Sequence, residues 1–379
     1  MPRLGLISDP DSPDHVARAL AQQLPEQLEE HIGGSEWVVE VVCDPVVAGR
    51  SKGKDILDTI ENQRTAQRWD YAIGVTDLPL RTSSRPVLAN IGGEHPRVGL
   101  VSLPALGGLQ PRRRARQMIL QAVDEILRAT EESRGTESAE EQPRKRRRGL
   151  HSALTELLAP IRREEPEGTA ISVRYRATKW RGRARLLSGM VRSNTPWRLV
   201  LGMSGAVAAS LATSVFGLTS STVWQIGNML GPARRGIVVA GVIALMATWL
   251  ILTHRLWEKP HHSHDREQRV LYNASTATTV TIGVGLMYVT LFLVNLALAS
   301  LLIDPQLLSS KLGGTTSFGD YLGLAWGAAS MGVAAGALGS GLEDDATVRR
   351  AAYGYREAQR RESQQRVEQQ QEQHGRNGG

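Results

Sequence analysis

The sequence predicts an α/β domain with a mixed sheet and helices, joined to an all-α domain of four transmembrane helices. Three observations predict this architecture: the first part of the chain alternates β-type and α-type patterns, the third part contains four stretches without charge, and a basic segment lies between them. The mean hydropathy of −0.23 resembles that of a soluble protein only because polar and apolar parts offset each other. A chain of 379 residues is also expected to form more than one domain.

Residues 1–130 are expected to form the α/β domain. Short β-branched runs alternate there with longer segments of helical period, which is the order of an α/β fold. These segments are, in chain order, the strand Arg3–Ser8, the helix Asp14–His31, the strand Trp37–Cys43, the helix Asp55–Arg68 and the strand Asp70–Thr76.

A hairpin and a last helix are expected to complete this domain. Gly92 and Gly93 predict the turn between the strands Pro86–Ile91 and Arg97–Leu103. Pro111–Glu131 has apolar residues at helical spacing and predicts an amphipathic helix. The antiparallel hairpin, added to the α/β order, makes the expected sheet a mixed one.

Residues 131–149 and 150–196 are expected to separate the two domains. The first segment is rich in Glu, Ser and Arg and predicts a disordered linker. Its basic run Arg144–Arg148 lacks the aromatic residues and the scaffold of a nucleic-acid site, so no nucleic-acid partner is expected.

The segment 150–196 is expected to be a basic juxtamembrane segment that contacts anionic phospholipids. Cations and aromatic residues are interleaved there, as they are at the depth of lipid headgroups. A simple cluster of charges that stops translocation would explain the same residues. The expected lipid-contacting residues are Arg174, Arg176, Lys179, Trp180, Arg181, Arg183, Arg185, Arg192 and Arg198.

Residues 197–342 contain four stretches without Asp, Glu, Lys or Arg, which are expected to cross a membrane. About 20 apolar residues in a helix span the hydrocarbon core. A helix buried in a soluble bundle keeps a polar face, and Ile237–Leu252 has none. The four helices are expected near 197–218, 236–253, 279–303 and 321–342.

The charges beside these spans predict that both termini are cytoplasmic. Fifteen Lys and Arg lie on one side of the spans, whereas the other side has only Arg234, Arg235 and Lys311. No signal peptide is expected, and the single Cys43 agrees with a reducing compartment. We therefore expect a multi-pass protein of the bacterial inner (plasma) membrane, with residues 343–379 as a cytoplasmic tail that changes from helix to disorder.

Inside the spans, small residues are more prominent than polar ones. The absence of ionisable residues argues against a proton-coupled pump, and groups such as Thr290 and Asn295 are expected to bond to their own helices. Small residues repeat at four-residue spacing and predict close packing, either within the chain or with a second membrane protein chain. The expected helix-packing residues are Gly202, Gly323, Gly327, Gly332 and Gly336.

Asp9, Asp44 and Asp77 are the main candidates for chemistry, because each follows an expected strand. Such a rim of carboxylates could bind a divalent metal, although Asp9 and Asp44 each precede a proline and fit simple turns equally well. Cys43 could pair with His15 or His95 as a nucleophile and its base, but no local signature supports such a pair. No catalytic residue, metal ligand or cofactor is therefore assigned.

Histidines in the expected loop between the second and third spans offer a second place where a metal could enter. They are His254, His261, His262 and His264, and no cysteine or spaced partner completes a tetrahedral site. A solvated loop explains them as well.

Residues 70–106 resemble the upstream strands of archaemetzincin-type zinc peptidases. The resemblance is carried by Asp70–Leu80, a strand ending in a Thr-Asp pair, and by Gly99–Leu106. It does not imply peptidase activity, because the corresponding helix reads Gln117–Ile126 without the His-Glu-x-x-His motif. The whole chain also resembles uncharacterised multi-pass membrane proteins of high-GC bacteria, in agreement with its 39 Arg and 6 Lys.

The sequence favours a non-catalytic membrane scaffold, that is, a binding or assembly protein with a cytoplasmic α/β domain. Its expected partners are anionic phospholipids and either a second copy or another membrane protein. Two alternatives stay open: a membrane-tethered, metal-dependent hydrolase that uses the three aspartates, and a small-solute permease or channel.

Overall fold

The structure is a computed structural model in which two compact units form, one within Met1–Ser193 and the other within Asn194–Gly354. The expected linker 131–149 and the tail 343–379 lie almost wholly outside the described residues. The structure describes residues 1–32, 36–44, 53–82, 85–92, 97–133, 161–164, 173–177, 179–257, 266–341, 343–345 and 348.

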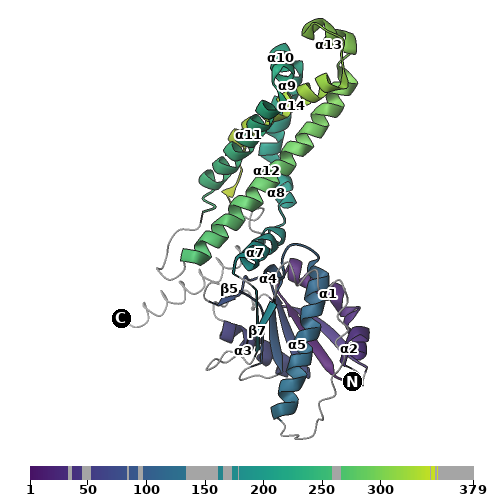
Figure 1. Ribbon diagram of the computed structural model, residues 1–379, viewed down its shortest axis with the longest axis vertical. Helices are drawn as coiled ribbons and strands as arrows, with labels where there is room; N and C mark the ends of the chain where they lie inside the picture. Colours follow the sequence, from purple (N-terminus) through teal and green to yellow (C-terminus); the bar gives the residue numbers. More distant parts are fainter. Residues whose placement is uncertain are drawn as a thin grey trace, which may run out of the picture. The chain divides into compact units, whose positions relative to one another are not determined.

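A mixed eight-stranded sheet forms the centre of the first unit, the α/β unit (Figure 1). The strand order is β2-β1-β3-β6-β5-β8-β7, and β4 pairs with β5. The pairs among β2, β1, β3 and β6 are parallel, and the remaining pairs are antiparallel. The strands are β1 (Arg3–Ser8), β2 (Val38–Cys43), β3 (Tyr71–Thr76), β4 (Arg81–Thr82), β5 (Arg85–Ile91), β6 (Val98–Ser102), β7 (Ile161–Glu164) and β8 (Val173–Ala177).

The mixed sheet and its antiparallel hairpin are confirmed, but the sheet extends beyond the expected domain end at residue 130. Strands β7 and β8 come from the segment 150–196, which was expected to lie against lipid. The reason is a period-two pattern: Val173, Tyr175 and Ala177 alternate with arginines, as residues of a strand do, and all three are buried. The parts of the segment 150–196 that form β7 and β8 therefore belong to the sheet.

Helices cover both faces of the sheet. On one face, Ile56 and Ile60 of a helix pack against Ile7 and Leu100 of the sheet. On the other face, Gly99 lies near Ile126 of a second helix. The helices are α1 (Ser12–Ala21), α2 (Leu24–Ile32) and α5 (Pro111–Ser133) on the face of Gly99, and α3 (Gly53–Ala66) on the face of Ile7.

The expected helix Asp14–His31 is two helices, α1 and α2. Pro25 is the second residue of α2. Proline has no backbone N–H to donate and its ring collides with the preceding turn, so it is tolerated at the start of a helix and not in its interior. The break at residues 22 and 23 follows from this proline.

The helix after β8, α7 (Lys179–Ser193), packs against the short helix α4 (Leu103–Leu106) and against β5. Its buried residues include Gly182, Leu186, Gly189 and Met190, which recur at helical spacing. Gly189 has no side chain because the backbone of Pro104 occupies that space. The α/β unit therefore includes a helix that the sequence placed at the membrane surface.

The second unit is all-α, and three of its helices are long and apolar enough to cross a membrane: α11 (Pro232–Thr253), α14 (Phe318–Ser340) and the part of α12 (Arg266–Leu302) that begins at Arg269. A fourth candidate is the pair Arg181–Gly202 and Ser204–Thr219, which bends by 58° at Met203. The helices of this unit are α8 (Trp197–Gly202), α9 (Ser204–Thr219), α10 (Ser221–Met229), α11 (Pro232–Thr253), α12 (Arg266–Leu302), α13 (Pro305–Leu312) and α14 (Phe318–Ser340).

Helix α14 is the centre of this unit and contacts α9, α10, α11 and α12. Most of its residues are buried, whereas α11 exposes Ile237, Leu245 and Leu252. The exposed fractions of these three side chains are 71%, 56% and 69%. A continuous apolar surface of this kind is unfavourable in water and is the usual outer surface of a membrane helix.

Candidate functional site

Two of the strand-end carboxylates are buried at the ends of neighbouring parallel strands. Asp9 follows β1 and Asp77 follows β3, and they are 2% and 5% exposed. The Thr76 hydroxyl donates to Oδ2 of Asp9 over 2.5 Å and accepts the backbone N–H of Leu78 over 3.0 Å. Asp9 thus bonds across two parallel strands and helps to fix the turn after β3.

The carboxylates beside β2 also have partners inside the fold. Asp44 accepts a hydrogen bond from the side chain of Gln63 on α3. Asp14, in the first turn of α1, accepts the Ser8 hydroxyl over 3.1 Å and Nε of Arg18 over 2.8 Å. These contacts are of the kind that position turns and helix ends.

Cys43 ends β2 and is exposed, but its surroundings do not activate the thiol. Desolvation raises its pKa, and the negative charge of Asp14 raises it further. A nucleophilic cysteine needs a lowered pKa. Among the described residues, no group of three or more His, Cys, Asp or Glu could hold a metal ion.

In the all-α unit, two glycines of α14 mark its closest approach to α9. A methyl group at Gly332 would lie 2.7 Å from the carbonyl oxygen of Ser210, and Gly336 faces the hydroxyl of the same serine. A methyl group at Gly332 would thus meet the backbone of α9, whereas one at Gly336 would meet a side chain and would lie 3.2 Å from the carbonyl oxygen of Ala206. These small residues therefore pack within one chain.

Two further glycines of α14 lie against α10. A methyl group at Gly327 would lie 2.7 Å from Cγ1 of Val223, and Gly323 faces the amide oxygen of Asn228. The fifth expected packing residue, Gly202, ends α8 and is partly exposed.

Sequence reasoning missed two further glycines of the contact between α9 and α14, Gly217 on α9 and Gly339 on α14. A methyl group at Gly217 would lie 3.2 Å from Cα of Ala328, and one at Gly339 would lie 2.6 Å from Cβ of Ala209. The signal was present, because Gly205, Ala209 and Gly217 lie on one four-residue ridge of α9.

Polar side chains of the membrane-length helices mostly bond locally. Thr290 donates to the carbonyl oxygen of Leu286 over 3.0 Å, and Asn295 donates to that of Leu291 over 2.7 Å. Both contacts join residues one turn apart, as expected for groups that satisfy themselves in an apolar surrounding. These two residues therefore act in the structure of their helix.

A short segment after α14 contacts the end of α11 and the start of α9. Asp345 Oδ1 lies 2.8 Å from Nδ1 of His254, the residue after α11, and Nε2 of His254 lies 3.1 Å from the carbonyl oxygen of Ser340. Glu343 accepts the backbone N–H of Gly205 at the start of α9. His254 is 1% exposed, so it is a structural residue; His261, His262 and His264 lie outside the described residues.

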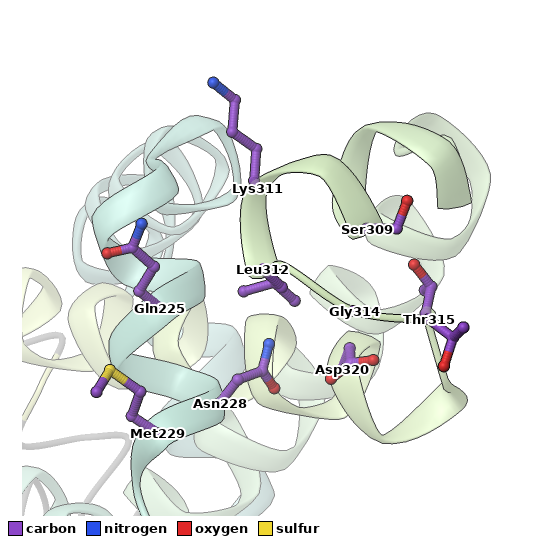
Figure 2. A pocket seen from close by; sticks show the side chains of 10 residues that line it. Gln225, Asn228, Met229, Ser309, Lys311, Leu312, Gly314, Thr315 and Asp320 are labelled. Carbon is purple, nitrogen blue, oxygen red and sulfur yellow. The ribbon is translucent and has the colours of Figure 1, made fainter.

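A cavity of about 530 Å³ lies where α10, α13 and the start of α14 meet. Figure 2 shows the ammonium group of Lys311 pointing away from the other lining side chains, and Asp320 is engaged by Ser317 in the cap of α14. The walls are therefore mainly uncharged and combine polar with apolar groups. They consist of Gln225, Asn228, Met229, Ser309, Lys311, Leu312, Gly314, Thr315, Thr316 and Asp320.

The expected lipid-contacting residues differ in how far they are exposed. Arg174 is 7% exposed and donates to Oδ1 of Asn90 over 3.1 Å, so its position inside the sheet does not fit lipid contact. Arg176 lies on the same strand and is partly buried. Arg183 and Arg185 are partly buried, Arg181, Arg192 and Arg198 are exposed, and the side chains of Lys179 and Trp180 lie outside the description.

Comparison of the chain with models of protein families, with curated proteins and with solved structures found no match.

Proposed function

We propose that this protein is an integral membrane protein whose α/β unit acts in the cytoplasm as a non-catalytic binding or assembly module. The fourth span in this proposal is α8 with α9, which lies within the bent pair Arg181–Gly202 and Ser204–Thr219 that is long and apolar enough to cross a membrane when the two parts are taken together. An even number of spans places both termini on one side, and the distribution of Lys and Arg favours the cytoplasmic side.

The observation that carries the non-catalytic part of the proposal is the use of the strand-end carboxylates inside the fold. Asp9 is bonded to Thr76, and Asp44 to Gln63. A hydrolase needs its carboxylates directed at a metal or a substrate. Here they support the loops that follow the strands, which favours a stable binding surface.

The test compares binding with catalysis on the full chain: binding by crosslinking in native membranes, and metal content and activity in nanodiscs. We expect chemical crosslinking in native membranes to give a discrete product of fixed stoichiometry that involves the α/β unit, either with a second copy or with another membrane protein. Metal analysis should give well below one ion per chain. The hydrolase would replace this proposal if the chain bound one metal ion and hydrolysed a substrate, and if Asp9→Asn or Asp77→Asn removed both properties. Asp124→Asn is the control and should then keep both.

The cavity beside α10 and α13 favours a second candidate, a protein that binds or moves a small neutral solute. Its volume of about 530 Å³ lies within the range of small-molecule sites. The amide nitrogen of Asn228 is buried and, among the described residues, has no hydrogen-bond partner. Uptake of amino acids or sugars into proteoliposomes, lost in Asn228→Leu but kept in Gln306→Leu, would support the permease instead of the scaffold.

A further inference from the structure

Three arginines from two distant segments converge on one turn of the α/β unit, between α4 and α5. Nη1 of Arg114 and Nε of Arg185 donate to the same carbonyl oxygen, that of Leu106, over 2.6 and 2.9 Å. Nη1 of Arg192 donates to the carbonyl oxygen of Gly108 over 2.9 Å. The two guanidinium groups on this oxygen repel each other, so the surrounding fold must hold them in place.

Gly107 allows this close arrangement. Its φ is 91°, and a methyl group there would lie 2.8 Å from Cγ of Arg185 and 2.9 Å from Nη1 of Arg114. A glycine is favoured for both reasons: the left-handed backbone and the space that the two side chains occupy. The turn is thus shaped around the arginines.

The three guanidinium groups have carbonyl partners but, within the described part of the chain, no carboxylate partner. Each guanidinium has five N–H donors, so most of them stay available in Arg114, Arg185 and Arg192. Desolvation and, second, the charge of Arg114 lower the pKa of Arg185 to about 10, so the group is still protonated at pH 7. Positive charge is therefore concentrated here, and no ion pair among the described residues offsets it.

The start of α5 adds to this positive field. Its first turn contains Arg112 and Arg113 beside Arg114, and no acidic residue. Cations at the N-terminus of a helix are unfavourable because of the helix dipole, whereas an anion there is stabilised. Leu109, in the same turn, is 76% exposed, and an exposed apolar side chain among cations is typical of a surface that contacts headgroups.

We propose that Arg114, Arg185 and Arg192 form a binding site for a phosphate group. Guanidinium groups bind phosphate through paired hydrogen bonds, and three of them around one turn supply both charge and geometry. The phosphate belongs either to an anionic phospholipid or to a soluble phosphate ester. The lipid source rests on the proposed membrane location, because α7 ends only a few residues before α8; the site itself does not depend on the scaffold role.

The experiment uses the purified full chain in a neutral detergent. Native mass spectrometry counts bound dioleoyl-phosphatidylglycerol or dioleoyl-phosphatidylcholine, and thermal unfolding reports binding of inorganic phosphate and glycerol 3-phosphate. We expect one phosphatidylglycerol to bind with high occupancy, and Arg114→Gln and Arg185→Gln each to weaken this binding at least about tenfold, as the loss of a charge-assisted hydrogen bond predicts. Arg128→Gln, on the same helix and with the same change of charge, is the control.

The outcomes separate the two sources of phosphate. Arginine-dependent binding of phosphatidylglycerol alone supports the site with a lipid headgroup, and arginine-dependent stabilisation by a soluble phosphate supports it with a soluble ester. Binding that responds equally to Arg128→Gln, or no binding of either kind, overturns the proposal. If Arg185→Gln does not fold, Arg192→Gln gives the same comparison, because its hydrogen bond is exposed. Absence of a protein partner would refute the scaffold and leave this site untouched.

Discussion

At the scale of single residues, glycines allow the closest contacts of this structure. Gly332 and Gly336 let α14 approach α9, and Gly107 makes room for two arginines. The sequence predicted the first two because small residues one turn apart share a helix face. It could not predict the contact of His254 with Asp345, because 91 residues separate them and neither lies in a repeating pattern.

We expect Gly332→Ala to destabilise the all-α unit by about 1–3 kcal/mol, the usual cost of overpacking a tight contact. The added methyl group would lie 2.7 Å from the carbonyl oxygen of Ser210, which belongs to a helix backbone and cannot easily move. The measurement is the thermal unfolding midpoint of the full chain in detergent. Gly241→Ala on α11 is the matched control, because nothing lies within 4 Å of a methyl group there. Equal midpoints for the two variants would show that α9 and α14 do not pack in this way.

The pKa of Cys43, the single cysteine, reports the burial and the charge at the end of β2. Because desolvation and the charge of Asp14 raise the pKa of Cys43, its reaction with iodoacetamide should reach half its maximal rate at a higher pH than in the urea-unfolded chain. Asp14→Asn should move this midpoint to lower pH, since the neutral amide no longer opposes the thiolate. Asp124→Asn should leave it unchanged. An unshifted midpoint in the folded chain would contradict the arrangement at the end of β2.

At the scale of elements, continuous apolar runs and long apolar segments were predictable, whereas short elements rich in arginine were not, even where their residues alternate with a period of two. Strand β1 has the expected bounds, because Arg3–Ser8 is a nearly continuous apolar run. Strand β8 has two arginines in five residues, and its basic composition hid the alternation of Val173, Tyr175 and Ala177. The face of α7 built on Gly182 and Gly189 was missed for the same reason.

A fragment of residues 1–193 should therefore unfold at a clearly higher temperature than a fragment of residues 1–130. The shorter fragment lacks β7, β8 and α7, so it exposes the edge of β5 and the buried surface of α4. Circular dichroism against temperature gives the midpoints, and light scattering detects the aggregation that an open sheet edge promotes. The same midpoint for both fragments would mean that 150–196 contributes nothing to the sheet.

At the scale of the whole molecule, the chain combines a sheet-centred unit with a helical unit that has a membrane-like outer surface. The three membrane-length helices follow from composition alone, since each is a long apolar segment. The fourth span is harder to recognise because the helix breaks at Met203, between Gly202 and Ser204, and small residues of this kind are common at kinks. If α8 and α9 cross as one span, both termini lie on the same side.

The most direct measurement of this arrangement is labelling with a membrane-impermeant maleimide in right-side-out membrane vesicles. Cys43 reports the position of the α/β unit, and Gly314→Cys, in a Cys43→Ser background, reports the turn between α13 and α14. Integral insertion predicts rapid labelling at position 314 in sealed vesicles and labelling of Cys43 only after permeabilisation. Labelling of both cysteines in sealed vesicles, or release of the protein into the soluble fraction by alkaline carbonate, would contradict it.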